Sequence, residues 1–211
     1  MSTLLDRVVR LENPGSLPQT PVDLSKLSGT QLKGFALLHL YDFMDQTWGP
    51  EALVAWQQTV PASLRSQVER RAVTSVGWLP IELYYSALSW GVQHRLGGEP
   101  REAIAVGAAI ATREINSFFR MVLGFTSPSM VLSMSGRFWR SYYDRSSLVV
   151  LASGPGFAHT EVRDWPLTDA ISMYEIAGSL LQWMEASRAR NVRISRLEYL
   201  GYGTFRVDAA W

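Results

Sequence analysis

The periodicity of the sequence changes near Asp144, and this change restricts the fold more than any other feature. Before it, apolar residues recur every three or four positions, as in amphipathic helices. After it come two pairs of strand-like segments, separated by one helical segment over 170–189. Strands joined by short turns are antiparallel. The pattern therefore predicts an α+β fold, in which a bundle of about six helices precedes a β-β-α-β-β antiparallel sheet.

Proline and glycine mark the expected helix boundaries. Ser28 or Thr30 is expected to cap the first helix of the bundle, and Pro50 to begin the second. Ser127 and Pro128 are expected to begin a later helix, and Thr168 or Asp169 to cap the helix over 170–189. The segment 100–124 begins with proline, ends with glycine and has an Ala-rich first half, which predicts a central buried helix. Leu197 and Tyr199 fall out of phase with the strand before them, which predicts a β-bulge.

The first 26 residues differ in character from the rest. A short apolar helix is expected over 3–12, followed by a proline-rich linker. We therefore divide the chain into an arm, 1–26, and one α+β domain, 27–211, with a helical part (27–144) and a sheet part (145–211). Such a short helix is unstable alone in water, so it must dock on its own domain, a second copy or a partner. The predicted interface residues are Leu4, Leu5, Val8, Val9, Leu11 and Trp211.

Composition excludes several classes of protein. Of the 211 residues, 47% are hydrophobic and the net charge is +1, so the chain is globular and lacks the excess of basic residues typical of a nucleic-acid-binding protein. It has no cysteine, which excludes disulfides and thiolate metal sites. The longest apolar run, 103–111, is far shorter than the ~20 residues of a membrane span. A cytoplasmic location is expected.

No catalytic or metal-binding motif is present. His39, His94 and His159 lie on three separate predicted elements, without the spacing of metal ligands. His39 falls on the apolar stripe of its helix, so a hydrogen-bonded core histidine is expected. His159 precedes Asp164 on a predicted strand, but the sequence contains no GxSxG nucleophile elbow. We therefore assign no catalytic residue and no metal ligand.

The aromatic residues before the sheet are the best candidate for a binding site. Trp139, Tyr142 and Tyr143 are spaced i, i+3, i+4 and share one face of a helix. Such a face can line an apolar pocket with a few polar groups, the usual form of a small-ligand site, or it can be core and interface packing. The predicted pocket residues are Phe118, Val122, Phe138, Trp139, Tyr142 and Tyr143.

Several phrases resemble a family of uncharacterised myxobacterial proteins. They include LKGFALLHLYDFMDQTWGPEAL, WLPIELYYSALSWGVQHRLGG, EAIAVGAAIA, SPSMVLSMSGRFW and the final AGSLLQWMEASRARNVRISRLEYLGYGTFRVDAAW. The resemblance covers residues 31–211. That family is similar in layout to the haem-nitric-oxide-binding, 4-vinyl-reductase-like and Bet3-type proteins. The resemblance implies a binding or sensory module, with a small apolar or haem ligand between helices and sheet, and provides no catalytic residues.

The haem ligands of those gas-sensing relatives have no counterpart here. The relatives use an axial histidine in the helix before the sheet and a Tyr-x-Ser-x-Arg motif. The corresponding helix in this chain, MVLSMSGRFWRSYYDR, has no histidine, and the run from Tyr142 to Arg145 does not match the motif. Because haem iron needs an axial ligand, no cofactor is expected, haem included.

Three functions remain open on this reading. The first is a non-catalytic small-ligand-binding or signalling module with an apolar pocket between helices and sheet. The alternative is a self-associating interaction or scaffold protein that uses the N-terminal helix, forming a homo-oligomer or binding a protein partner. A third and weaker option is an enzyme with a carboxylate site at Asp42 and Asp45, which are more simply exposed helix residues.

Overall fold

The computed structural model describes residues 3–13, 17, 22–115, 127–167 and 169–211. In chain order the described elements are η1 (Leu5–Arg7), β1 (Gln31–Lys33), α1 (Gly34–Trp48), α2 (Pro50–Thr59), α3 (Ala62–Arg65), η3 (Ser66–Val68), β2 (Trp78–Pro80), α4 (Ile81–Arg95), η4 (Pro100–Glu102), α5 (Ala103–Glu114), α7 (Pro128–Tyr142), β3 (Ser147–Gly154), β4 (Phe157–Arg163), α8 (Ala170–Ala186), β5 (Arg193–Gly201) and β6 (Thr204–Ala210).

The four C-terminal strands form one antiparallel sheet in the order β3-β4-β6-β5. Each hairpin pairs two strands that are adjacent in sequence, and β4 pairs with β6 to join the hairpins. The register of β5 shifts between Ile194 and Arg196, at the bulge that the sequence predicts. The α+β class and the β-β-α-β-β order are confirmed.

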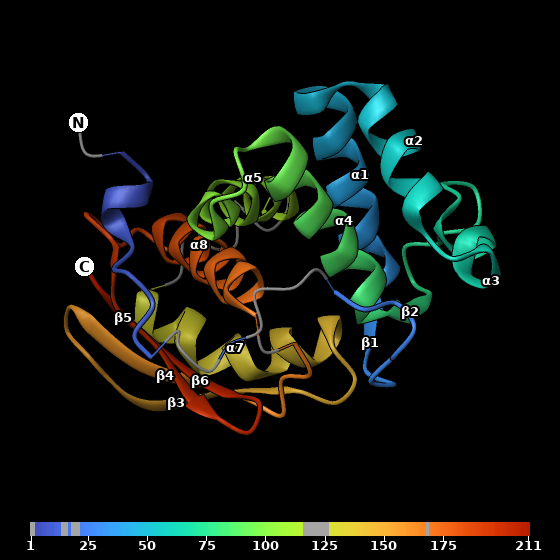
Figure 1. The fold of residues 1–211 in the computed structure, drawn as a ribbon. Coiled ribbons are helices and arrows are strands. Elements are labelled where there is room, and N and C mark those ends of the chain that lie inside the picture. The colour runs from blue at the N-terminus through green and yellow to red at the C-terminus, as the bar shows by residue number, and fades with distance from the viewer. Residues whose placement is uncertain (1–2, 14–16, 18–21, 116–126, 168) are drawn as a thin grey trace.

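Two helices lie on the inner face of this sheet. Figure 1 shows α8 between α5 and the sheet, α7 along the sheet, and α1 to α4 grouped on the far side of α5. Side-chain oxygens of Ser127 and Asp169 cap α7 and α8 by accepting hydrogen bonds from main-chain amides. Both caps satisfy amides that a helix start otherwise leaves unpaired, as the sequence predicts.

A small second sheet was not foreseen. β1 and β2 pair antiparallel, with Leu32 opposite Leu79. The first helix of the bundle therefore begins at Gly34, so the expected caps at Ser28 and Thr30 are wrong. The amide of Ser28 instead donates to a carboxylate oxygen of Glu82, at 2.6 Å. Strands of three residues are too short to show a period of two in the sequence, and this explains the difference.

The N-terminal arm is extended for most of its described length. The expected helix over 3–12 is limited to the single turn η1, after which the amide of Val9 donates to the carbonyl of Ile194 and that of Glu12 to Leu197. The arm thus lies beside the edge strand β5 as a parallel neighbour. An edge strand offers unpaired main-chain groups, which stabilise an extended neighbour better than water stabilises a short helix.

The apolar residues proposed for an interface contact the chain's own domain. Val8 and Leu11 are buried, Leu4, Leu5 and Trp211 are partly buried against the core, and Val9 is 37% exposed. The guanidinium of Arg101 donates to the carbonyls of Leu5 and Val8. The arm is therefore docked within the chain. In the described part of the chain, none of the helices has the length and apolar character of a membrane span.

Candidate functional site

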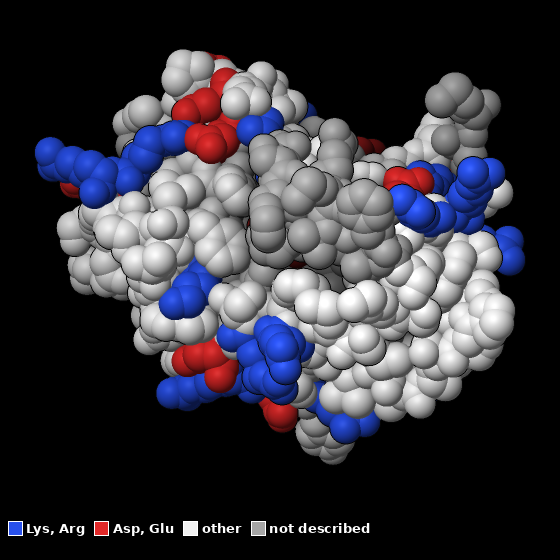
Figure 2. Space-filling view, turned by 180° about the vertical axis from the view of Figure 1, so that it is seen from behind, with Lys and Arg blue, Asp and Glu red and all other residues white. Residues whose placement is uncertain are grey.

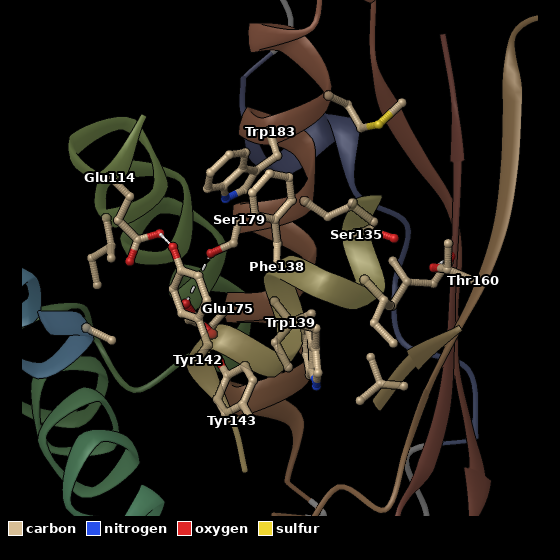
Figure 3. Close-up of a pocket in the computed structure, with 18 of the residues that line it drawn as sticks. Glu114, Ser135, Phe138, Trp139, Tyr142, Tyr143, Thr160, Glu175, Ser179 and Trp183 are labelled. Atoms are coloured by element: carbon tan, nitrogen blue, oxygen red, sulfur yellow. Dashed lines mark hydrogen bonds between the residues drawn. The ribbon is translucent and has the colours of Figure 1, made fainter. Parts of the chain in front are cut away.

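A cavity of about 120 Å³ lies where α5, α7 and α8 meet the sheet. Figure 3 shows its aromatic wall, which comes mainly from α7, and its acidic side chains, which come from α5 and α8. Four of the predicted pocket residues line it: Phe138, Trp139, Tyr142 and Tyr143. Phe118 and Val122 lie outside the described residues. The rest of the lining is mostly aliphatic, with Thr160 and Val207 contributed by the sheet.

The aromatic wall also supports the core. The indole nitrogen of Trp139 donates to the hydroxyl of buried Ser146 at 2.9 Å, and its ring lies 4.6 Å from that of Tyr143. Phe138 stacks on Trp183 of α8, with ring centroids 5.8 Å apart. Both functions proposed for these side chains from the sequence, pocket lining and core packing, are therefore served by the same residues.

Glu175 is the central polar group of the cavity. It lies on the buried face of α8 and is 5% exposed. One carboxyl oxygen accepts from the phenol of Tyr85 at 2.9 Å, and the other from Tyr84 at 3.2 Å and the hydroxyl of Ser179 at 3.1 Å. Burial raises the pKa of Glu175 to about 7, with the nearby Glu114 charge acting in the same direction against the hydrogen bonds.

Glu114 is the second carboxyl group at the cavity. Its side chain, at the end of α5, is 8% exposed and accepts a hydrogen bond from the phenol of Tyr142 at 2.9 Å. Burial, and next the Glu114 charge, hold the pKa of Tyr142 well above its usual range. The sequence analysis missed both glutamates. A glutamate inside the apolar run AISMYEIAGSLL was the available signal for Glu175, because buried carboxylates are rare without a partner.

A neighbouring cavity of about 260 Å³ shares Glu114, Phe138, Tyr142 and Trp183 with the first and is also lined by His39. The Nδ1 atom of His39 is buried, has no hydrogen-bond partner among the described residues and lies 3.5 Å from a Glu114 oxygen. The expectation of a fully hydrogen-bonded core histidine is therefore wrong. The side chain as a whole is 30% exposed, at the border between α1 and the cavity.

The remaining candidates do not assemble into a site. His159 pairs with Asp208 at 2.9 Å on the sheet, and not with Asp164. Asp42 and Asp45 both bind the guanidinium of Arg70, so they act as an exposed ion-pair network. Within the described ranges, no group of three or more metal-ligating side chains comes together.

Charge on the surface is distributed in small groups. On the face shown in Figure 2, Lys and Arg side chains stand in separate clusters, several beside acidic residues, with uncharged surface between them. Elsewhere in the described residues, Arg70 pairs with Asp42 and Arg206 with Glu161. The described surface of this face therefore resembles an ordinary solvated exterior.

The chain is similar in fold to solved H-NOX structures. It matches the Fe(II) unliganded H-NOX protein from K. algicida with a TM-score of 0.65 and 12% identity, covering 85% of this chain and 96% of that one. An oxygen-binding H-NOX domain related to soluble guanylate cyclases matches with a TM-score of 0.60 and 10% identity, over 84% and 93%. At these identities the likeness concerns the fold.

A third match is a structure from work on modulating haem redox potential through porphyrin distortion. Its TM-score is 0.58 at 10% identity, over 84% of this chain and 98% of that one. No family model and no curated protein matches the chain, so the resemblance to a myxobacterial family stays a prediction. The likeness in layout to the haem-nitric-oxide-binding fold is confirmed.

These neighbours overturn the expectation that the chain takes no cofactor. Haem is the cofactor that these neighbours indicate. It needs basic partners for its propionates and an axial ligand for its iron. The larger cavity holds two carboxyl groups and no Lys, Arg or His in its described lining, a poor match to the propionates of haem. The neighbouring cavity offers His39, whose orphaned ring nitrogen is of the type that ligates haem iron. His39 is therefore the one histidine in the described lining of the two cavities.

Proposed function

We propose that the protein is a non-catalytic ligand-binding module of the sensory type, and that the cavity beneath α7 holds a small, mainly apolar, ring-bearing molecule. The observation that carries this proposal is the cavity itself, which is enclosed by aromatic and aliphatic side chains around a few buried polar groups. Its location between helices and sheet on an H-NOX-like fold supports the same function.

The volume of the cavity indicates the size of the ligand. An engineered apolar cavity of about 150 Å³ in another protein binds benzene, so a cavity of about 120 Å³ is of the order of a single ring. A larger ligand would need the cavity to join its neighbour, which is separated from it by the shared side chains of Tyr142 and Phe138.

The proposal is tested with the full chain and a panel of single-ring compounds plus haem. Binding is expected to raise the melting temperature and to quench tryptophan fluorescence, because Trp139 and Trp183 line the cavity. A new Soret absorption band on adding haem would identify haem as a ligand of the module. If no member of the panel changes either signal, the proposal fails.

A blocking variant locates the binding site. Ile176 lies on α8 and lines the cavity, so Ile176→Phe fills part of its volume and is expected to abolish binding of single-ring compounds. Ile171→Phe is the matched control, because Ile171 is partly buried on the same helix but does not line the cavity. Equal loss of binding in both variants would contradict this location.

A further inference from the structure

Two buried carboxyl groups face one apolar cavity, and no cation lines it in the described part of the chain. Glu114 and Glu175 both line the larger cavity, and its described lining includes no Lys, Arg or His. Figure 3 shows the hydroxyl of Tyr142 directed at Glu114, and Glu175 beside Ser179. In the described residues, their side-chain hydrogen-bond donors are the hydroxyl groups of Tyr142, Tyr84, Tyr85 and Ser179, and all of these are neutral.

Neutral donors do not remove the cost of burying a negative charge. A carboxylate taken out of water is stabilised fully only when it is paired with a positive charge as well as hydrogen-bonded. The imidazole of His39 lies 3.5 Å from a Glu114 oxygen, without hydrogen-bond geometry to it. Glu175 contacts Tyr84, Tyr85 and Ser179, and none of these described partners is basic. Within the described lining, the two carboxyl groups therefore have no cation between them.

The aromatic wall favours a cation in the same place. Phenol and indole rings attract a cation placed over their faces, and the attraction is strongest where water is excluded. Tyr142, Phe138 and Trp183 form such a wall beside Glu114. The side of the cavity next to the sheet is aliphatic, with Leu148, Val162 and Val207. The cavity therefore has an acidic, aromatic end and an apolar end.

We propose that the ligand of this cavity is a small amphiphilic amine, whose protonated nitrogen lies between Glu175 and Glu114 and whose apolar body lies against the sheet. This inference rests on the proposed function, because it names the ligand class of the same cavity. A carboxylic acid of the same size is excluded by repulsion from the two glutamates. The raised pKa of Glu175 agrees with this reading, because it marks a carboxyl group that lacks a cation.

Three probes of matched size distinguish the contribution of the charged nitrogen to binding from that of the apolar part. 2-Phenylethylamine carries the cation, propylbenzene replaces the nitrogen with carbon, and 3-phenylpropionate carries a negative charge. Isothermal titration calorimetry of the full chain is expected to show the amine binding about tenfold or more tighter than propylbenzene, the factor typical of a hydrogen bond to a charged group. The propionate is expected not to bind.

Glutamine substitutions assign the preference to the two carboxyl groups. Glu175→Gln keeps the shape and removes the charge, so it is expected to abolish the preference for the amine over propylbenzene. Glu114→Gln tests the other carboxyl group. It also replaces Glu175→Gln as the test of the amine preference if that variant fails to fold. Glu82→Gln is the control, because Glu82 is equally buried but lies outside the cavity. The control is expected to keep the preference.

The outcomes distinguish the two proposals. If propylbenzene binds as tightly as the amine, or if the glutamine variants keep the preference, the amine inference fails while the ligand-binding function stands. If neither compound binds the wild-type chain, the inference fails. The proposed function fails with it only if haem and the rest of the panel also leave the chain unchanged. Proton release on amine binding at neutral pH, measured in buffers of different ionisation enthalpy, would support ionisation of Glu175 by the ligand.

Discussion

Gly107 of α5 packs directly against the main-chain carbonyl of Glu175 of α8. A methyl group at Gly107 would lie 2.1 Å from that oxygen, closer than any real contact, and one at Gly178 would lie 2.2 Å from the carbonyl of Ile104. The two helices therefore approach through their glycines. The main chain of Glu175 forms this contact, and its side chain lines the cavity. The helix contact therefore sets the position of the carboxyl group.

Gly107→Ala is expected to destabilise the fold. Alanine favours a helix over glycine by about 1 kcal/mol, but the methyl group would force α5 away from α8, at a typical cost of about 1–3 kcal/mol for overpacking. The net free energy of unfolding, measured by urea denaturation, is expected to fall. Ala105→Gly on the exposed face of α5 is the control, with a loss of about 1 kcal/mol from propensity alone. A more stable Gly107→Ala variant would contradict the close helix contact.

Glu175 is expected to make the stability of the chain decrease as the pH rises. Its pKa is about 7 in the folded chain against 4.5 for the ordinary side chain, so between these values the folded state holds a proton that the unfolded state releases. The effect is absent below pH 4.5, complete above pH 7, and corresponds to about 3 kcal/mol. Glu175→Gln removes this contribution.

The measurement compares denaturant unfolding of the wild type and Glu175→Gln at pH 5 and pH 8. The variant is expected to gain stability relative to the wild type at the higher pH. Other groups titrate equally in both proteins, so the difference isolates Glu175. A difference that does not change with pH would show that the carboxyl group is not desolvated as described.

Arg101 is expected to hold the N-terminal arm against the domain. It donates to the carbonyls of Leu5 and Val8, at 2.9 and 2.7 Å. Arg101→Met removes both hydrogen bonds, so the amides of Val9 and Glu12, which bond to β5, are expected to exchange faster with deuterium. Arg10→Met is the control on the exposed side of the arm. Unchanged exchange in the Arg101 variant would contradict the docking.

The same variant tests self-association through the arm. If the arm serves only its own domain, light scattering of wild type and Arg101→Met is expected to give the same molecular mass. A mass that changes when the arm is released would favour the alternative function, in which the apolar residues from Leu4 to Leu11 join two copies.

The sequence predicts those parts of the fold that are determined by residues close together in the chain. The caps at Ser127 and Asp169 and the bulge before Leu197 each follow from residue types a few positions apart. The pairing of β1 with β2 and the course of the arm along β5 depend instead on partners more than forty positions away. Periodicity cannot report such pairings, because each strand is short and gains its hydrogen bonds from outside the segment.

The site residues also fall into those that local spacing predicts and those that depend on tertiary packing. The spacing of Trp139, Tyr142 and Tyr143 places them on one helix face, and the structure brings them to one cavity. The meeting of Glu114 with Glu175 depends on how α5 and α8 pack, which spacing within one helix does not show. The expectation about cofactors was wrong because it rested on a motif in one helix, whereas the fold as a whole is that of haem-binding neighbours.

The most direct test of the account follows the methionine methyl groups by NMR. Met184 lines the cavity, whereas Met44 is equally buried in α1 and does not line it. During titration of ¹³C-methyl-labelled chain with 2-phenylethylamine, the Met184 signal is expected to shift and saturate while the Met44 signal stays in place. A Met184 signal that stays fixed with this amine, with propylbenzene and with haem would contradict a ligand site in the cavity.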